Sequence, residues 1–86
     1  MTEMDKLEKG LKERGMNYLR RPLNDGEQIL VFDDEERLQW DAVCGPFTYG
    51  GPDGLLETMG LDLPDEQDEG DDVVGWLTAD QILEVL

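Results

Sequence analysis

The chain has 86 residues, a length that suits one compact domain, and 38% of them are apolar. That share is enough for one core but leaves few residues to line a large internal ligand cavity. The formal net charge is −15. A surface this acidic repels nucleic-acid phosphates and anionic membranes and attracts basic proteins. We therefore expect no direct nucleic-acid or membrane binding.

The charge is distributed unevenly along the chain. Residues 1–21 carry six of the seven cations and four acids, a net charge of +2. Residues 22–86 carry eighteen acids and only Arg37, a net charge of −17. Cys44 is the single cysteine, so it forms no internal disulfide, and no apolar segment resembles a signal peptide or a membrane span. These features predict a cytoplasmic protein.

The first predicted element is a helix over roughly residues 2–14. Apolar residues recur there at helical spacing, at Met4, Leu7 and Leu11, and Gly15 is a suitable stop. Acid-to-base pairs four residues apart are expected to stabilise its exposed surface, namely Asp5 with Lys9 and Glu8 with Lys12.

Three strand-like runs follow, at residues 17–21, 28–32 and 37–44. Turn residues 24–26 separate the first two, and the acidic residues 33–36 separate the last two. The third run alternates apolar and polar residues, which is typical of a half-buried strand. Its apolar members are expected to face the core together: Leu38, Trp40, Ala42 and Cys44.

The second half of the chain predicts loops and two short helices. Residues 45–54 are rich in Gly and Pro and form a loop, after which Pro52 opens a helix that ends at Gly60. Residues 62–72 hold seven acids among eleven residues, which predicts a mobile surface loop. Thr78 and Gln81 have the spacing of a capping box and begin the last helix.

Together these elements predict a single-domain α+β protein. It would have an N-terminal helix, a three-stranded antiparallel meander, and two short C-terminal helices packed on one face of the sheet.

Carboxylates are plentiful but match no recognised catalytic or ligand pattern. Glycosidase-type chemistry needs one carboxyl held neutral in an apolar cleft, whereas most acids here lie in turns and at 62–72, in water. A calcium loop placed on Asp65 puts Trp76 where the bidentate Glu belongs. One Cys and no His disfavour zinc, and the glycines at 50–54 lack the Lys and Ser/Thr of a phosphate loop. We expect a non-enzymatic protein without metal or cofactor.

Two stretches carry a family resemblance: residues 49–60 (YGGPDGLLETMG) and 74–82 (VGWLTADQI). With the strand run that ends in WDAVC at 40–44, they resemble small uncharacterised proteins carried by phages and conjugative elements of Gram-positive gut bacteria. The resemblance covers about the C-terminal two-thirds of the chain. It implies a mobile-element setting and transfers no site residues.

Two binding hypotheses follow from these observations. In the first, acidic groups occupy a basic, nucleic-acid-binding surface of a host protein, in place of phosphates. The predicted contact residues are Asp33, Asp34, Glu35, Glu36, Asp65, Glu66, Asp68, Glu69, Asp71 and Asp72.

In the second hypothesis the chain is a small accessory domain that binds through an apolar patch containing Phe47 and Tyr49. Its acidity would then serve solubility alone. Ionic strength separates the two hypotheses, because salt screens binding through carboxylates and hardly affects binding through an apolar patch. The charge distribution favours the first hypothesis.

Overall fold

The computed structural model describes residues 1–61 and 73–86, which form two α-helices and a five-stranded sheet. This confirms the predicted α+β class and the N-terminal helix. The acidic loop predicted at about 62–72 lies outside the described residues. In chain order the elements are α1 (Glu3–Glu13), β1 (Asn17–Leu23), β2 (Gly26–Phe32), β3 (Leu38–Cys44), the 3₁₀ turn η1 (Gly51–Asp53), β4 (Leu56–Met59), β5 (Val73–Leu77) and α2 (Ala79–Leu83).

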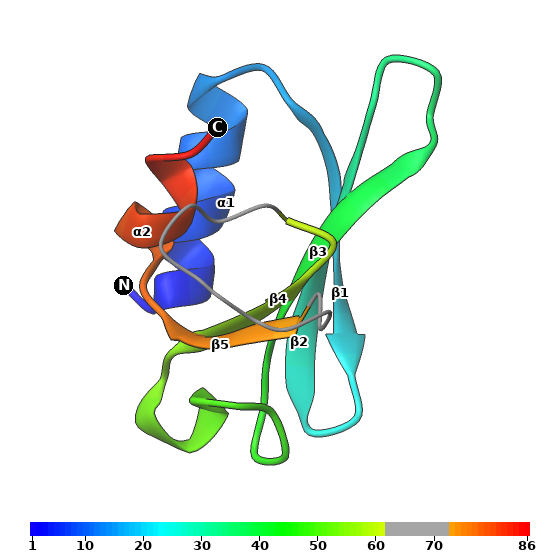
Figure 1. Cartoon of the computed structure of the whole chain (residues 1–86). Helices are drawn as coiled ribbons and strands as arrows, with labels where there is room; N and C mark the ends of the chain where they lie inside the picture. Colours follow the sequence, from blue (N-terminus) through cyan, green and yellow to red (C-terminus); the bar gives the residue numbers. More distant parts are fainter. Residues whose placement is uncertain (62–72) are drawn as a thin grey trace.

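The sheet is antiparallel, and its strands lie side by side in the order in which they occur in the chain. Both helices lie next to each other on one side of this twisted sheet (Figure 1). A single core therefore forms between the helices and one sheet face. Its buried members are Met4, Leu7, Leu11, Ile29, Val31, Trp40, Ala42, Leu56, Val74, Leu77, Ala79 and Ile82.

Both helices begin in capping boxes. In α1 the hydroxyl of Thr2 accepts a hydrogen bond from the backbone N–H of Asp5, whose carboxylate accepts one from Thr2 in return. In α2 Thr78 and Gln81 make the corresponding pair, which confirms the predicted helix start. The helices also touch at Gly10, where a Cβ would lie only 2.5 Å from the side chain of Leu83.

The prediction that Leu38 faces the core was wrong. Val31 pairs with Trp40, but Phe32 pairs with Leu38, so Gln39 is an extra residue in β3. Such a bulge moves the residues beyond it to the opposite face of the sheet. Leu38 is consequently 55% exposed, whereas Trp40 and Ala42 are buried as expected.

The three-stranded meander and the first short C-terminal helix were also wrong. The chain beyond Pro52 makes only the 3₁₀ turn η1, and then extends as β4. Leu56 and Thr58 are buried while Met59 is exposed, an alternation of period two that marks a strand. Gly60, expected as a helix cap, follows β4 with a φ of +87°. β5 is a fifth strand that the sequence patterns did not predict.

The buried hydroxyl of Thr58 allows a test of hydrogen bonding in the core. Its hydroxyl lies in the core with the residue 1% exposed, and it has no hydrogen-bond partner among the described residues. A buried hydroxyl without a partner costs about 1–3 kcal/mol. Thr58→Val keeps the side-chain shape and is expected to raise the free energy of unfolding by about 1 kcal/mol in urea denaturation.

Thr78→Val is the matched control, because the Thr78 hydroxyl caps α2. Its replacement is expected to lower the free energy of unfolding by about 1 kcal/mol. Equal destabilisation by both substitutions would show that the Thr58 hydroxyl makes a stabilising hydrogen bond.

Candidate protein-binding surfaces

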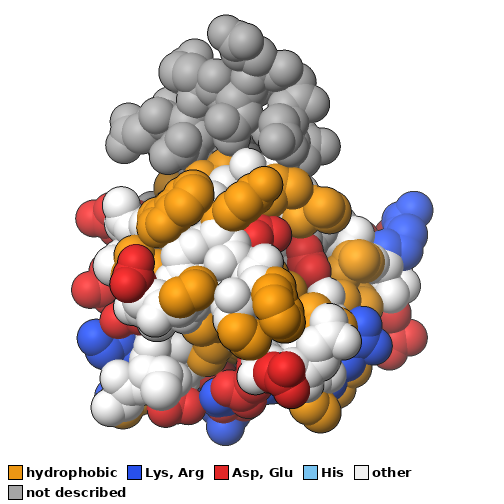
Figure 2. Space-filling view, turned by 90° about the horizontal axis from the view of Figure 1, so that it is seen from below, with side chains coloured by type: hydrophobic (Ala, Val, Ile, Leu, Met, Phe, Trp, Pro, Cys, Tyr) orange, Lys and Arg blue, Asp and Glu red, His pale blue; other side chains and the backbone are white. Residues whose placement is uncertain are grey.

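The loop between β3 and β4 brings exposed aromatic residues to one end of the molecule. Phe47 and Tyr49, both predicted from the sequence as a binding patch, are 86% and 57% exposed. In Figure 2, which shows this end from below, hydrophobic side chains gather across the surface with carboxylates beside them. The structure therefore keeps both predicted residues accessible to a partner.

Trp76 belongs to the same surface, although the sequence patterns did not indicate it. Its indole ring stacks on the ring of Tyr49, with centroids 5.4 Å apart and planes inclined by 17°. The backbone N–H of Trp76 donates to the carbonyl of Tyr49 at 3.2 Å. These residues lie 27 positions apart in the chain, so only the fold brings them together.

The second predicted surface is the acidic turn between β2 and β3, residues 33–36. Asp33 holds the turn together, since its carboxylate accepts hydrogen bonds from the backbone N–H groups of Glu35 and Arg37 at 2.8 and 2.9 Å. Arg37 in turn contacts the Glu35 carboxylate. Asp34, Glu35 and Glu36 are exposed at the tip. Three of the four predicted acids are therefore presented to solvent, and Asp33 is structural.

Glu36 adopts a left-handed backbone conformation, with φ at +64°. Glycine is the usual residue at such a position, because a side chain there costs about 1–2 kcal/mol. The hydrogen bond from its N–H to the Asp33 carbonyl, at 3.0 Å, completes the turn around it. A carboxylate is thus kept at the hairpin tip in spite of backbone strain.

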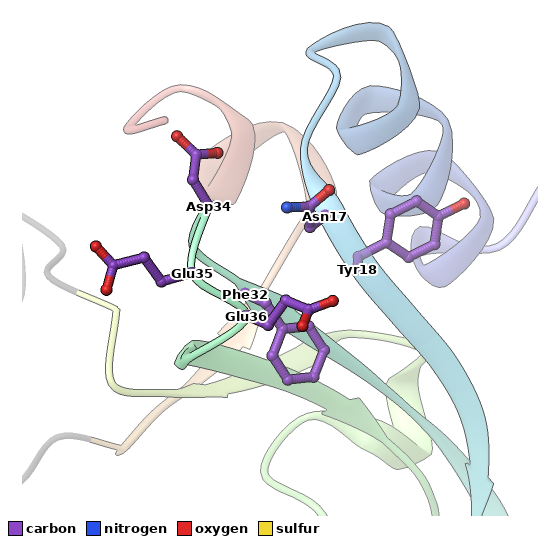
Figure 3. Close-up of a pocket in the computed structure, with 6 residues that line it drawn as sticks. All are labelled: Asn17, Tyr18, Phe32, Asp34, Glu35 and Glu36. Atoms are coloured by element: carbon purple, nitrogen blue, oxygen red, sulfur yellow. The ribbon is translucent and has the colours of Figure 1, made fainter.

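A hollow of about 620 Å³ lies beside this turn, lined by Asn17, Tyr18, Phe32, Asp34, Glu35 and Glu36. The lining side chains do not converge on one point: the carboxylates of Asp34 and Glu35 point outward, and Tyr18 points toward α1 (Figure 3). The acids of this lining are exposed. The geometry therefore presents their carboxylates to the surface of a partner.

The remaining predicted acids, Asp65, Glu66, Asp68, Glu69, Asp71 and Asp72, lie outside the described residues. Within residues 1–61 and 73–86, no group of His, Cys, Asp and Glu side chains is arranged to hold a metal ion. Cys44 is half-buried against the core, and burial raises the pKa of its thiol. In the same part of the chain, neither helix is long and apolar enough to cross a membrane.

A third charged group is half-buried and lies between α1 and the sheet. The Arg20 guanidinium of β1 makes a bidentate pair with Glu27, at 2.6 and 2.9 Å, and also reaches Asp5 and Glu8 of α1, at 3.0 and 2.9 Å. These partners raise the pKa of Arg20, with Glu27 contributing most. Asp5 and Glu8, which were expected to pair with lysines of α1, therefore bind across to the sheet. The network anchors α1 to β1 and β2.

No protein-family model, curated protein or solved structure matches this chain.

The Arg20 network predicts a specific pH dependence. A hydrogen bond from the Tyr18 hydroxyl at 2.9 Å, followed by the Arg20 contact, holds the pKa of Glu8 below its ordinary value of 4.5. A lowered pKa stabilises the fold while the carboxyl is ionised, above pH 4.5, and this stabilisation is lost as the pH falls through the lowered pKa. Glu8→Gln is expected to unfold more easily than the unmodified protein at neutral pH, with the difference closing in acid.

This prediction is tested by measuring the urea midpoints of the unmodified protein and of Glu8→Gln from neutral pH into acid. Glu13→Gln is the control, because it removes the same charge from an exposed position of α1. A difference that is the same for both variants at every pH would show that net charge, and not the Arg20 network, is responsible.

Glu36 gives a second prediction. Glu36→Gly is expected to raise the free energy of unfolding by about 0.5–1 kcal/mol, the relief of strain being partly offset by the freedom of glycine in the unfolded chain. Glu35→Gly, at a neighbouring position without positive φ, is expected to lower it. Thermal unfolding of the two variants measures both effects. If Glu36→Gly is the less stable variant, the turn does not store the strain assigned to it.

Proposed function

We propose that the protein is a non-enzymatic acidic binding protein that occupies a basic surface of a protein partner. The observation that supports this most directly is Glu36, a carboxylate kept at an exposed hairpin tip where glycine would remove the backbone strain. Strain that packing does not require is a feature of functional positions. Asp34 and Glu35 add two further exposed carboxylates beside it.

The arrangement of cations supports the same proposal. Beyond α1 the four described arginines are already engaged. Arg14 donates to the backbone carbonyls of Gly10 and Leu83. Arg20 is held in its network, Arg21 bonds the side chain of Gln28, and Arg37 pairs with Asp33 and Glu35. The lysines all lie on α1, at 6, 9 and 12. The hairpin tip therefore has a net negative field, which speeds encounter with a basic protein and penalises acidic ones.

The kind of partner follows from charge and from the family resemblance. A basic protein surface that accepts clustered carboxylates is one that otherwise holds phosphates. The resemblance to proteins of phages and conjugative elements favours a host protein that handles nucleic acid. In this proposal the chain acts by blocking that surface.

A second function is kept because of the exposed aromatic residues. Phe47 and Tyr49 are accessible enough to anchor an apolar partner, and the acidity would then serve solubility alone. The two functions differ in their response to salt and in the residues on which they depend.

The proposed function is tested by capture from the lysate of a Gram-positive host, with elution by rising salt. The tagged protein is compared with Asp34→Asn/Glu35→Gln/Glu36→Gln and with a control, Glu13→Gln/Asp80→Asn/Glu84→Gln, which removes the same charge from exposed helical positions. We expect one basic nucleic-acid-handling protein to elute at moderate salt, to be lost from the hairpin variant, and to be retained by the control.

Retention of the same partner by both variants at about 1 M salt, where charge interactions are screened beyond about 3 Å, would overturn the proposal. Loss of that partner on replacing Phe47 or Tyr49 would then support the apolar function.

A further inference from the structure

The stacked pair of Tyr49 and Trp76 is unusual in how little of it is buried. The two side chains are 57% and 60% exposed, although they are among the largest apolar groups in the chain. They hold each other in place by stacking and by the backbone hydrogen bond between them. A rigid aromatic surface is therefore presented to solvent.

The backbone at Trp76 is strained in a way that packing does not explain. Leu56 pairs with Leu77 and Thr58 with Val74, so Glu57 lies opposite two residues of β5, Gly75 and Trp76. Trp76 occupies this bulge with φ at +56°. Glycine is the residue expected at a left-handed bulge position, and a bulky side chain there is a genuine outlier.

The part of the chain that carries the pair supplies no cation to cover these rings. Residues 38–86 contain no Lys or Arg, so their charged side chains are all negative. One carboxylate is close by, because Glu57 accepts a hydrogen bond from the backbone N–H of Tyr49 at 2.8 Å. Exposed aromatic faces beside carboxylates attract cations through both the ring quadrupole and simple charge.

We infer that the Tyr49–Trp76 pair is the anchor for an arginine side chain of the basic protein partner. Arginine fits better than lysine, because its planar, weakly hydrated guanidinium stacks on aromatic rings while its edge donates to carboxylates. The inference rests on the proposed function, and it adds a second contact at a different end of the molecule from the acidic turn.

The probes are two blocked peptides of equal charge, tetra-arginine and tetra-lysine. Each is titrated into the full-length protein by calorimetry at fixed salt, and by NMR of the tryptophan indole N–H groups. We expect tetra-arginine to bind more tightly, with a shift confined to the Trp76 signal and with upfield movement of the arginine side-chain protons that lie over the rings. In an exposed site, this stacking should make the dissociation constant of tetra-arginine about two- to five-fold lower than that of tetra-lysine.

Trp76→Gly should remove that two- to five-fold preference for arginine while leaving lysine binding unchanged. This variant relieves the backbone strain, so it is expected to remain folded and to unfold at a higher temperature. Leu38→Ala is the control, since Leu38 is another exposed apolar side chain, 55% exposed and outside the pair. It should leave both affinities unchanged.

An unchanged arginine preference in Trp76→Gly, or the absence of upfield shifts, overturns the inference. If the hairpin variant still weakens both peptides in that case, the acidic binding function stands without the aromatic anchor. If the hairpin variant weakens neither peptide and salt has no effect, the proposed function and the inference both fail.

Discussion

Neither helix of this protein is long enough to be stable alone in water, since α1 has 11 residues and α2 has five. Each depends on the single apolar face of the sheet and on the other helix. The two are joined at their beginnings, because the Glu3 carboxylate accepts a hydrogen bond from the backbone N–H of Ala79 at 2.7 Å. That bond is the main reason why the pKa of Glu3 is lowered. Covering one sheet face with two coupled helices builds the core.

The attachment of the helices to the sheet also involves the charged side chains. Arg20 is the cation that joins the helix layer to the sheet, and three carboxylates converge on it, which keeps α1 in register with β1 and β2. Most of the other described acids lie away from this layer, in turns and on the surface. Their mutual repulsion opposes folding, and salt relieves it. The chain keeps this charge although a small core offers little surplus stability.

Patterns in the sequence predicted the elements whose signals are local. The spacing of Met4, Leu7 and Leu11 gave α1, and the capping box at Thr78 gave α2. They failed where a contact between distant segments decides the structure. Residues 55–59 fit a short helix or a strand equally well, and pairing with β3 selects the strand. In β5 the bulge breaks the alternation that would have revealed it. The exposed acids of the hairpin tip could be predicted, whereas the Tyr49–Trp76 pair could not, because its members meet only in the fold.

Three described residues other than glycine have a left-handed backbone conformation: Asn24, Glu36 and Trp76. Asn24 is of a residue type that tolerates this conformation, whereas Glu36 and Trp76 are not. The side chains of Glu36 and Trp76 are both exposed, at opposite ends of the molecule. A core residue can be held in such a conformation by its packing, but an exposed one gains too little from packing to offset about 1–2 kcal/mol. For a chain of this size the total stability is about 4–13 kcal/mol, so each strained position is a substantial fraction of it. Glycine would fit both positions with less strain. That a carboxylate stands at one and an aromatic ring at the other is explained if both side chains act on a partner, the first through charge and the second through stacking.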